Sequence, residues 1–86
     1  MALSDECRVL LCANGPAGAL ALSVLRRDLR LNPENMLCAT YDTPPNRELL
    51  RELSRASIPT LYDGIGSPSV VQQVSEFAPD IVLSMH

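Results

Sequence analysis

The sequence predicts an α/β domain with an open parallel sheet, built in the order β-α-β-α-β-α-β. Short apolar runs alternate with stretches of helical spacing along the 86 residues. Each of the three helical stretches begins with a cap residue followed within two positions by proline. The first apolar run is apolar at almost every position, which is typical of a strand covered on both faces. A chain of this length has room for one domain.

The first strand is expected over residues 8–13, and the first helix begins at Asn14-Gly15-Pro16. Spacings of three, four and seven predict the residues of this helix that face the core. They are Ala17, Leu20, Ala21, Val24 and Leu31. Arg26, Arg27 and Arg30 lie mostly off this stripe, near the negative end of the helix dipole.

The second strand is expected over residues 36–41 and ends near Asp42. Thr43-Pro44-Pro45 then begins the second helix, whose inward stripe is Leu49, Leu50 and Leu53. Residues 58–61 form a third strand at an edge of the sheet, because Pro59 has no N–H to donate to a ladder.

The third helix begins at Ser67-Pro68, with Ser67 as its cap. Its predicted inward residues are Val70, Val71, Val74 and Phe77. The last strand is expected over residues 81–86.

Right-handed crossovers predict the strand order 3-2-1-4, numbered along the chain. The first and fourth strands are then neighbours, and a crevice opens above their carboxyl ends, near Asn14 and His86. No segment follows residues 81–86 to pair with the outer edge of that strand. We therefore expect an incomplete sheet that self-associates through this edge or requires a missing remainder.

The amino-acid composition argues against some classes of binding partner. The net charge is −3, with seven arginines and no lysine, which gives no footprint for nucleic acid through this segment. The three cysteines fit no CxxC spacing and are expected to be reduced and inert. No apolar run approaches the ~20 residues that cross a bilayer, so the expected location is cytoplasmic and no membrane partner is predicted.

The turn at residues 13–18 is similar to a dinucleotide-binding fingerprint in which Ala13 replaces the first glycine. Asp42 follows Gly18 by 24 residues, at the position expected to bind a ribose hydroxyl. Two interpretations stay open. Either Gly15 lets an anion approach the helix start, or Gly15 and Gly18 serve close helix packing and Asp42 opens the next turn.

Three further side chains are candidates for chemistry. His86, the sole histidine, is either an acid, base or hydrogen-bond donor at the crevice or a polar residue without a role, and alone it predicts no metal site. Asp42 and Asp63 each follow an expected strand and either share acid–base work or stabilise turns. The absence of GxSxG argues against a serine hydrolase.

Three segments resemble the amino-terminal subdomain of the folate-dependent formyltransferases, the family of methionyl-tRNA formyltransferase and glycinamide ribonucleotide formyltransferase. They are Cys38-Ala-Thr-Tyr-Asp-Thr-Pro44, Ala56-Ser-Ile-Pro-Thr-Leu61 and Glu76-Phe-Ala-Pro-Asp-Ile-Val-Leu-Ser-Met-His86. Within the last, Ala78-Pro79-Asp80-Ile81-Val82 is the most telling. The resemblance spans nearly the whole chain, and implies a Rossmann-like fold in which residues 1–86 are this subdomain and the carboxyl-terminal part is missing.

The resemblance also implies a reaction, in which a formyl group passes from 10-formyltetrahydrofolate to an amine. It implies that Asn14 and Gly15 contact the amine acceptor and that Met85 and His86 line the folate pocket. The family's catalytic asparagine, histidine and aspartate lie beyond this sequence, so the chain alone is expected to be inactive. A non-catalytic nucleotide-binding module that uses Gly15 and Asp42 is the alternative, and a truncated product without activity is a third.

Overall fold

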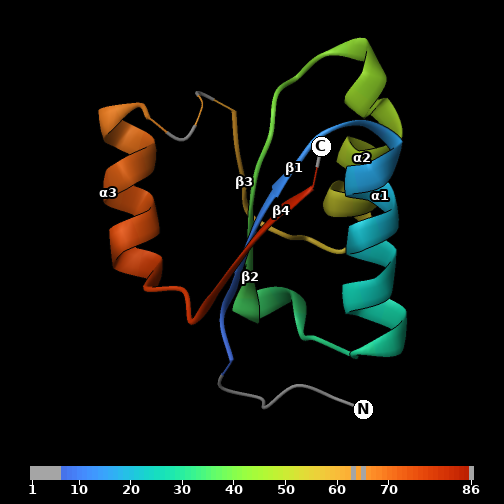
Figure 1. The fold of residues 1–86 in the computed structure, drawn as a ribbon, viewed down its shortest axis with the longest axis horizontal. Coiled ribbons are helices and arrows are strands. Elements are labelled where there is room, and N and C mark those ends of the chain that lie inside the picture. The colour runs from blue at the N-terminus through green and yellow to red at the C-terminus, as the bar shows by residue number, and fades with distance from the viewer. Residues whose placement is uncertain (1–6, 63, 65, 86) are drawn as a thin grey trace.

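The computed structural model describes residues 7–62, 64 and 66–85 (Figure 1). Over these residues four strands and three α-helices alternate. They are β1 (Val9–Ala13), α1 (Gly15–Ser23), β2 (Met36–Ala39), α2 (Arg47–Arg55), β3 (Thr60–Leu61), α3 (Pro68–Phe77) and β4 (Ile81–Met85). Short 3-10 turns, Pro33–Asn35 and Pro44–Asn46, precede β2 and α2. The predicted alternation is confirmed.

The sheet is parallel throughout, in the order β3-β2-β1-β4, as predicted. Val9 of β1 pairs with Met36 of β2 on one side and with Ile81 of β4 on the other. The helices α1 and α2 cover one face of the sheet, and α3 lies on the other face (Figure 1). The short β3, which follows Pro59, is an edge strand, also as predicted.

Side chains alternate between the two faces of each strand and so divide the core in two. Val9 and Leu11 of β1 pack with Leu22 of α1, with Leu25 of the π-helical turn Val24–Asp28 that follows α1, and with Leu49 and Leu53 of α2. Leu10, between them in sequence, points to the opposite face and packs beneath α3 with Val70. The cluster beneath α3 has fewer buried residues than the cluster beneath α1 and α2.

The predicted inward face of α1 is wrong. Leu20 is 66% exposed and Val24 is 39% exposed, whereas Gly18, Leu22 and Leu25 are buried. The reason is that residues 15–22 carry no polar side chain, so the pattern points in no direction. Leu31 is buried as predicted, and Ala17 and Ala21 are half-buried. After Ser23 the helix continues as a π-helical turn, in which the N–H of Leu29 donates to the Val24 carbonyl at 3.1 Å.

The other two helices follow their predicted patterns more closely. In α2, Leu49 and Leu53 are buried and Leu50 is half-buried. In α3, Val70 is buried and Val74 and Phe77 are half-buried, but Val71 is 51% exposed, so its predicted inward position is wrong. Only a narrow strip of α3 touches the sheet, and Val71 lies about 100° around the helix from Val70. Ser67 caps α3 as predicted, since its Oγ accepts a hydrogen bond from the Val70 N–H at 3.5 Å.

Arg8, Phe77 and Asp80 join the start of β1 to the start of β4. The Arg8 N–H donates to Asp80 Oδ2 at 2.9 Å, and the Arg8 carbonyl accepts from the Asp80 N–H at 2.8 Å. The Arg8 guanidinium donates to the Phe77 carbonyl at 2.8 Å and lies 6.0 Å from the centre of the Phe77 ring. These contacts fix the register of β4 against β1. No helix in the described part of the chain is long and apolar enough to cross a membrane.

Candidate functional site

The turn after β1 lies directly beside the end of β4. Asn14 is extended, with φ −145°, and Gly15 has the left-handed φ of +62°, after which Pro16 begins the first turn of α1. The Asn14 N–H donates to the Met85 carbonyl at 2.9 Å. The tips of β1 and β4 therefore meet at one edge of the sheet, as the topology predicts. His86, the other predicted residue of this edge, lies outside the described residues.

Asn46, in the turn before α2, holds this edge together. Its side chain is buried, with 2% exposure, and its Oδ1 accepts a hydrogen bond from the Gly15 N–H. Its Nδ2 donates to Asn14 Oδ1 at 3.1 Å, to the Tyr41 carbonyl at 2.8 Å and, at a longer 3.3 Å, to Thr43 Oγ1. Asn46 is not among the site residues predicted from the sequence. Its only feature in the sequence is its place directly after Pro44-Pro45, which is typical of an ordinary helix cap.

These bonds use most of the donors at the start of α1. The Gly15 N–H is bonded to Asn46, Pro16 has no N–H, and the Gly18 N–H donates to the Asn14 carbonyl at 3.1 Å. Ala17 retains the one N–H of this turn without a partner among the described residues. A phosphate at this helix start would therefore meet fewer N–H groups than the fingerprint requires.

Gly18 fits the packing interpretation of the fingerprint. A Cβ added to Gly18 would lie 2.7 Å from the Ala13 Cβ, so only glycine lets α1 approach β1 this closely. Gly15 differs, because a Cβ there would meet nothing within 4 Å and its requirement for glycine is the positive φ alone. The surface above Gly15 is thus open to a ligand.

A pocket of about 280 Å³ adjoins this edge, on the α3 side of the sheet. Its wall is mostly apolar and is formed by Cys12, Asn14, Ala39, Thr40, Tyr41, Gly64, Val82 and Ser84. Thr40 is only 3% exposed, and its Oγ1 has no hydrogen-bond partner among the described residues. An unpaired buried hydroxyl costs stability, so its presence in a pocket wall suits a ligand with one polar atom.

The predicted aspartates are only partly placed. Asp42 follows β2 in the loop that Asn46 fastens to the β1 turn, and its exposed carboxylate has no partner among the described residues. Asp63 lies outside the described residues, so the predicted pairing of Asp42 with Asp63 is untested.

Burial raises the pKa of two cysteine thiols. Cys38 is fully buried, and burial, with a smaller effect from the nearby Cys12, raises its pKa to about 12. Burial also raises the pKa of Cys12. Both thiols stay protonated near neutral pH and are poor nucleophiles, which fits their predicted inert role. The described residues contain no group of three or more His, Cys, Asp or Glu side chains placed to hold a metal ion.

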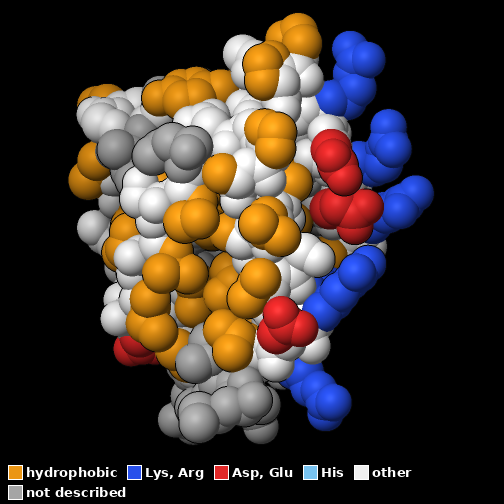
Figure 2. Space-filling model, turned by 45° about the vertical axis from the view of Figure 1, so that its right-hand side comes forward, with side chains coloured by type: hydrophobic (Ala, Val, Ile, Leu, Met, Phe, Trp, Pro, Cys, Tyr) orange, Lys and Arg blue, Asp and Glu red, His pale blue; other side chains and the backbone are white. Residues whose placement is uncertain are grey.

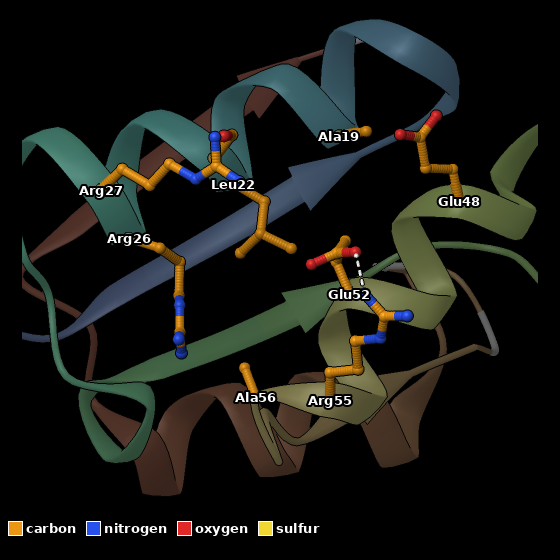
Figure 3. A pocket seen from close by; sticks show the side chains of 9 residues that line it. Ala19, Leu22, Arg26, Arg27, Glu48, Glu52, Arg55 and Ala56 are labelled. Carbon is orange, nitrogen blue, oxygen red and sulfur yellow. Dashed lines mark hydrogen bonds and ion pairs between the residues drawn. The ribbon is translucent and has the colours of Figure 1, made fainter.

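A second cavity, of about 450 Å³, lies between α1 and α2 (Figure 3). Side chains of both charges line it: Arg26 and Arg27 come from the end of the first helix, and Glu48, Glu52 and Arg55 from α2. Glu52 and Arg55 form an exposed ion pair at 3.3 Å. Because two carboxylates as well as three guanidiniums line this groove, it does not select for an anion.

The fold and the crevice define a small α/β domain with an open parallel sheet, whose β1 and β4 tips border one pocket. No protein-family model and no curated protein matches the sequence.

Proposed function

We propose that this chain is the amino-terminal part of a folate-dependent formyltransferase. The hydrogen bond between the Asn14 N–H and the Met85 carbonyl, at 2.9 Å, is the observation that carries the proposal. The resemblance assigns the amine acceptor to the β1 tip and the folate to the β4 tip. Transfer needs the amine and the formyl carbon close together, so adjacent tips support this assignment.

Each tip has a separate role in the proposal. Asn14 and Gly15 contact the acceptor, and Met85 and His86 contact 10-formyltetrahydrofolate beside the pocket, whose wall includes Ser84 of β4 but not Met85. Because the Gly15 N–H is already bonded to Asn46, Gly15 contributes an open backbone surface rather than a hydrogen bond. The acceptor amine attacks the formyl carbon, and the donors that stabilise the resulting oxyanion belong to sequence outside these 86 residues. The chain alone binds ligands without catalysing transfer.

Three unpaired cysteines suit a reducing compartment, so a cytoplasmic location is part of the proposal. The proposal also makes a direct prediction about the gene. The coding sequence beyond His86 contains an Asn-x-His-Pro-Ser-like segment, and its absence from a continuous reading frame would count against a formyltransferase.

Ligand binding by the chain itself is tested by thermal unfolding with a stable analogue of 10-formyltetrahydrofolate. At about ten times the Kd, the ligand adds about 1.4 kcal/mol of stability, which raises Tm by roughly 5–10 °C. Met85→Ser removes this shift, whereas Val71→Ser, at a comparably exposed site on α3, retains it. No shift at saturating analogue would reject the folate assignment.

A non-catalytic nucleotide-binding module is the second candidate, favoured by the unpaired carboxylate of Asp42 beside the β1 turn. NAD is the probe for it. Under this second proposal NAD raises Tm, Asp42→Asn reduces the rise, and the folate analogue has no effect. The small number of free N–H groups at the start of α1 makes this candidate the weaker of the two.

A further inference from the structure

Asn14 is followed by Gly15, and no other asparagine of the sequence precedes a glycine. An asparagine before glycine can lose ammonia without an enzyme, because the next backbone nitrogen attacks its side-chain carbonyl carbon and glycine has no Cβ to obstruct the approach. Both residues are half-buried, and a Cβ on Gly15 would meet nothing within 4 Å. Lack of access therefore does not protect this pair from reaction.

The reaction is an intramolecular displacement of ammonia. A base from solvent takes the proton of the Gly15 N–H, and the nitrogen attacks Asn14 Cγ. The bond between Cγ and Nδ2 then breaks, and ammonia leaves with a proton from solvent. Water opens the resulting five-membered succinimide at one of its two carbonyls. Residue 14 becomes aspartate, or isoaspartate in which the backbone passes through the side chain, and nothing is oxidised or reduced.

The conformation of Asn14 in the structure does not permit this ring closure. The Cα–Cβ bond and the bond to the Gly15 nitrogen must be nearly eclipsed, which for an L-residue requires a ψ of about −120°. The ψ of Asn14 is 145°, about 95° away. The Asn14 N–H donates to the Met85 carbonyl at 2.9 Å, and the Asn14 carbonyl accepts from the Gly18 N–H at 3.1 Å. These two bonds hold the backbone on both sides of Asn14 in the unreactive conformation.

Asn46 holds the two groups that would have to react. Its Oδ1 accepts a hydrogen bond from the Gly15 N–H, so the proton that must leave is already bonded. Its Nδ2 donates to Asn14 Oδ1 at 3.1 Å, so the side chain that must turn toward Gly15 is held as well. The orientation of the Asn46 amide is determined by the backbone, because the Gly15 N–H can only donate and the Tyr41 carbonyl can only accept.

We propose that Asn14 is a latent deamidation site that the folded protein keeps unreacted, chiefly through Asn46. Asn14 reacts when the turn opens or the chain unfolds, so the modification records the time spent in open states. Isoaspartate adds one atom to the backbone before Gly15 and displaces the Gly15 N–H from Asn46. Either product adds a carboxylate at the β1 tip, whereas most of the arginines and acidic side chains visible in Figure 2 lie along one border of the molecule.

Mass spectrometry of tryptic peptides tests the proposal after incubation at mildly alkaline pH, in buffer and in urea. The peptide of residues 9–26 contains Asn14 and no other side-chain amide, so replacement of its NH2 group by OH is assigned directly. In urea Asn14 reacts faster than Asn35, which precedes the larger Met36. In buffer Asn14 of the native chain reacts at least about tenfold more slowly than in urea.

Asn46→Ala is expected to raise the rate in buffer at least about fivefold, because it releases both reacting groups. Leu53→Ala is the matched control. It also removes a buried side chain, but Leu53 packs in the core beneath α2, so this variant keeps the slow rate of the native chain. Asn46→Asp retains an acceptor for the Gly15 N–H and reacts more slowly than Asn46→Ala. Circular dichroism and a cooperative melt establish that each variant is folded.

Equal rates for the native chain in buffer and in urea overturn the proposal, as does an Asn14 that stays intact in urea. A folded Asn46→Ala that reacts as slowly as the native chain also overturns it, and so does an equal acceleration in Leu53→Ala. The comparison of buffer with urea needs no variant, so it decides whether the fold protects Asn14 even where Asn46→Ala does not fold. None of these readouts uses a folate or a nucleotide, so they are separate from the tests of the proposed function.

Discussion

The side-chain oxygen of Asn46 accepts a hydrogen bond from the backbone N–H of Gly15, 31 residues earlier in the chain. The amide nitrogen of the same side chain donates to Asn14 and to the Tyr41 carbonyl. One buried side chain thus joins the loop after β2 to the turn after β1. The geometry of the candidate site depends on this connection, because Asn14 also bonds to Met85 of β4.

Replacing Asn46 with alanine is expected to lower the free energy of unfolding by about 2–4 kcal/mol, because it removes a buried side chain with four hydrogen-bond partners and leaves the half-buried Gly15 N–H unpaired. Urea unfolding followed by circular dichroism measures the change. Asn32→Ala is the control, since Asn32 is exposed and its side chain caps nothing, and its cost is below about 0.5 kcal/mol. Equal effects of the two substitutions would show that Asn46 does not hold the turn.

Gly18→Ala is expected to destabilise the protein by about 1–3 kcal/mol, because the new methyl group would lie 2.7 Å from the Ala13 Cβ. Gly66→Ala is the matched substitution. A Cβ at Gly66 meets nothing within 4 Å, so this variant is neutral or more stable by up to about 1 kcal/mol. Chemical denaturation of both variants checks the difference, and a tolerated Gly18→Ala would mean that α1 shifts easily on the sheet.

Ala78→Gly is expected to stabilise the protein by about 0.5–1 kcal/mol. Ala78 ends α3 in the left-handed conformation, with φ +53°, which glycine adopts without steric cost. The control is Ala56→Gly at the end of α2, where φ is −85° and glycine only adds disorder to the unfolded chain. Thermal melts should move in opposite directions, and a loss of stability in Ala78→Gly would contradict the account.

The Cys38 thiol is expected to resist thiol reagents until the protein unfolds, whereas the half-buried Cys7 reacts first. The pKa of Cys38 in the folded protein is about 12, above the usual value of 9.0. The stability linked to Cys38 is therefore fully present below about pH 9 and is lost as pH rises toward 12. Urea unfolding along an alkaline pH series measures this loss, which is smaller in Cys38→Ala. Rapid labelling of folded Cys38 would contradict the burial.

The sequence was sufficient to predict the strand order, because short apolar runs and right-handed crossovers leave few topologies. It also identified β3 as an edge through Pro59 and the buried side of α2 through its alternating charges. The buried face of α1 was predicted wrongly. Leu20 and Leu22 are equally apolar, and only contact with α2 and the sheet decides which of them is buried. The predicted burial of Val71 was wrong for a related reason, because only a narrow strip of the α3 surface contacts the sheet.

The candidate site was predictable in outline. Parallel strands ending at one edge bring Asn14 and Met85 together whatever their side chains. The use of the Gly15 N–H was not predictable, because its acceptor, Asn46, is distant in sequence and resembles a helix cap. The unpaired hydroxyl of Thr40 was also not predictable, because the neighbouring sequence does not indicate whether a buried threonine hydroxyl forms a hydrogen bond.

The contacts between Arg8 and Asp80 join positions 72 residues apart, and this separation governs how the protein folds. Closing a loop of that length costs about 4 kcal/mol of chain entropy before any pairing repays it. Among the described strands β4 is also the last to be synthesised, so β1 pairs with β2 while its other side waits for β4 in the nascent chain. This sheet should therefore be complete only after β4 has been synthesised, and chaperones that shield exposed strands have the most to offer in that interval.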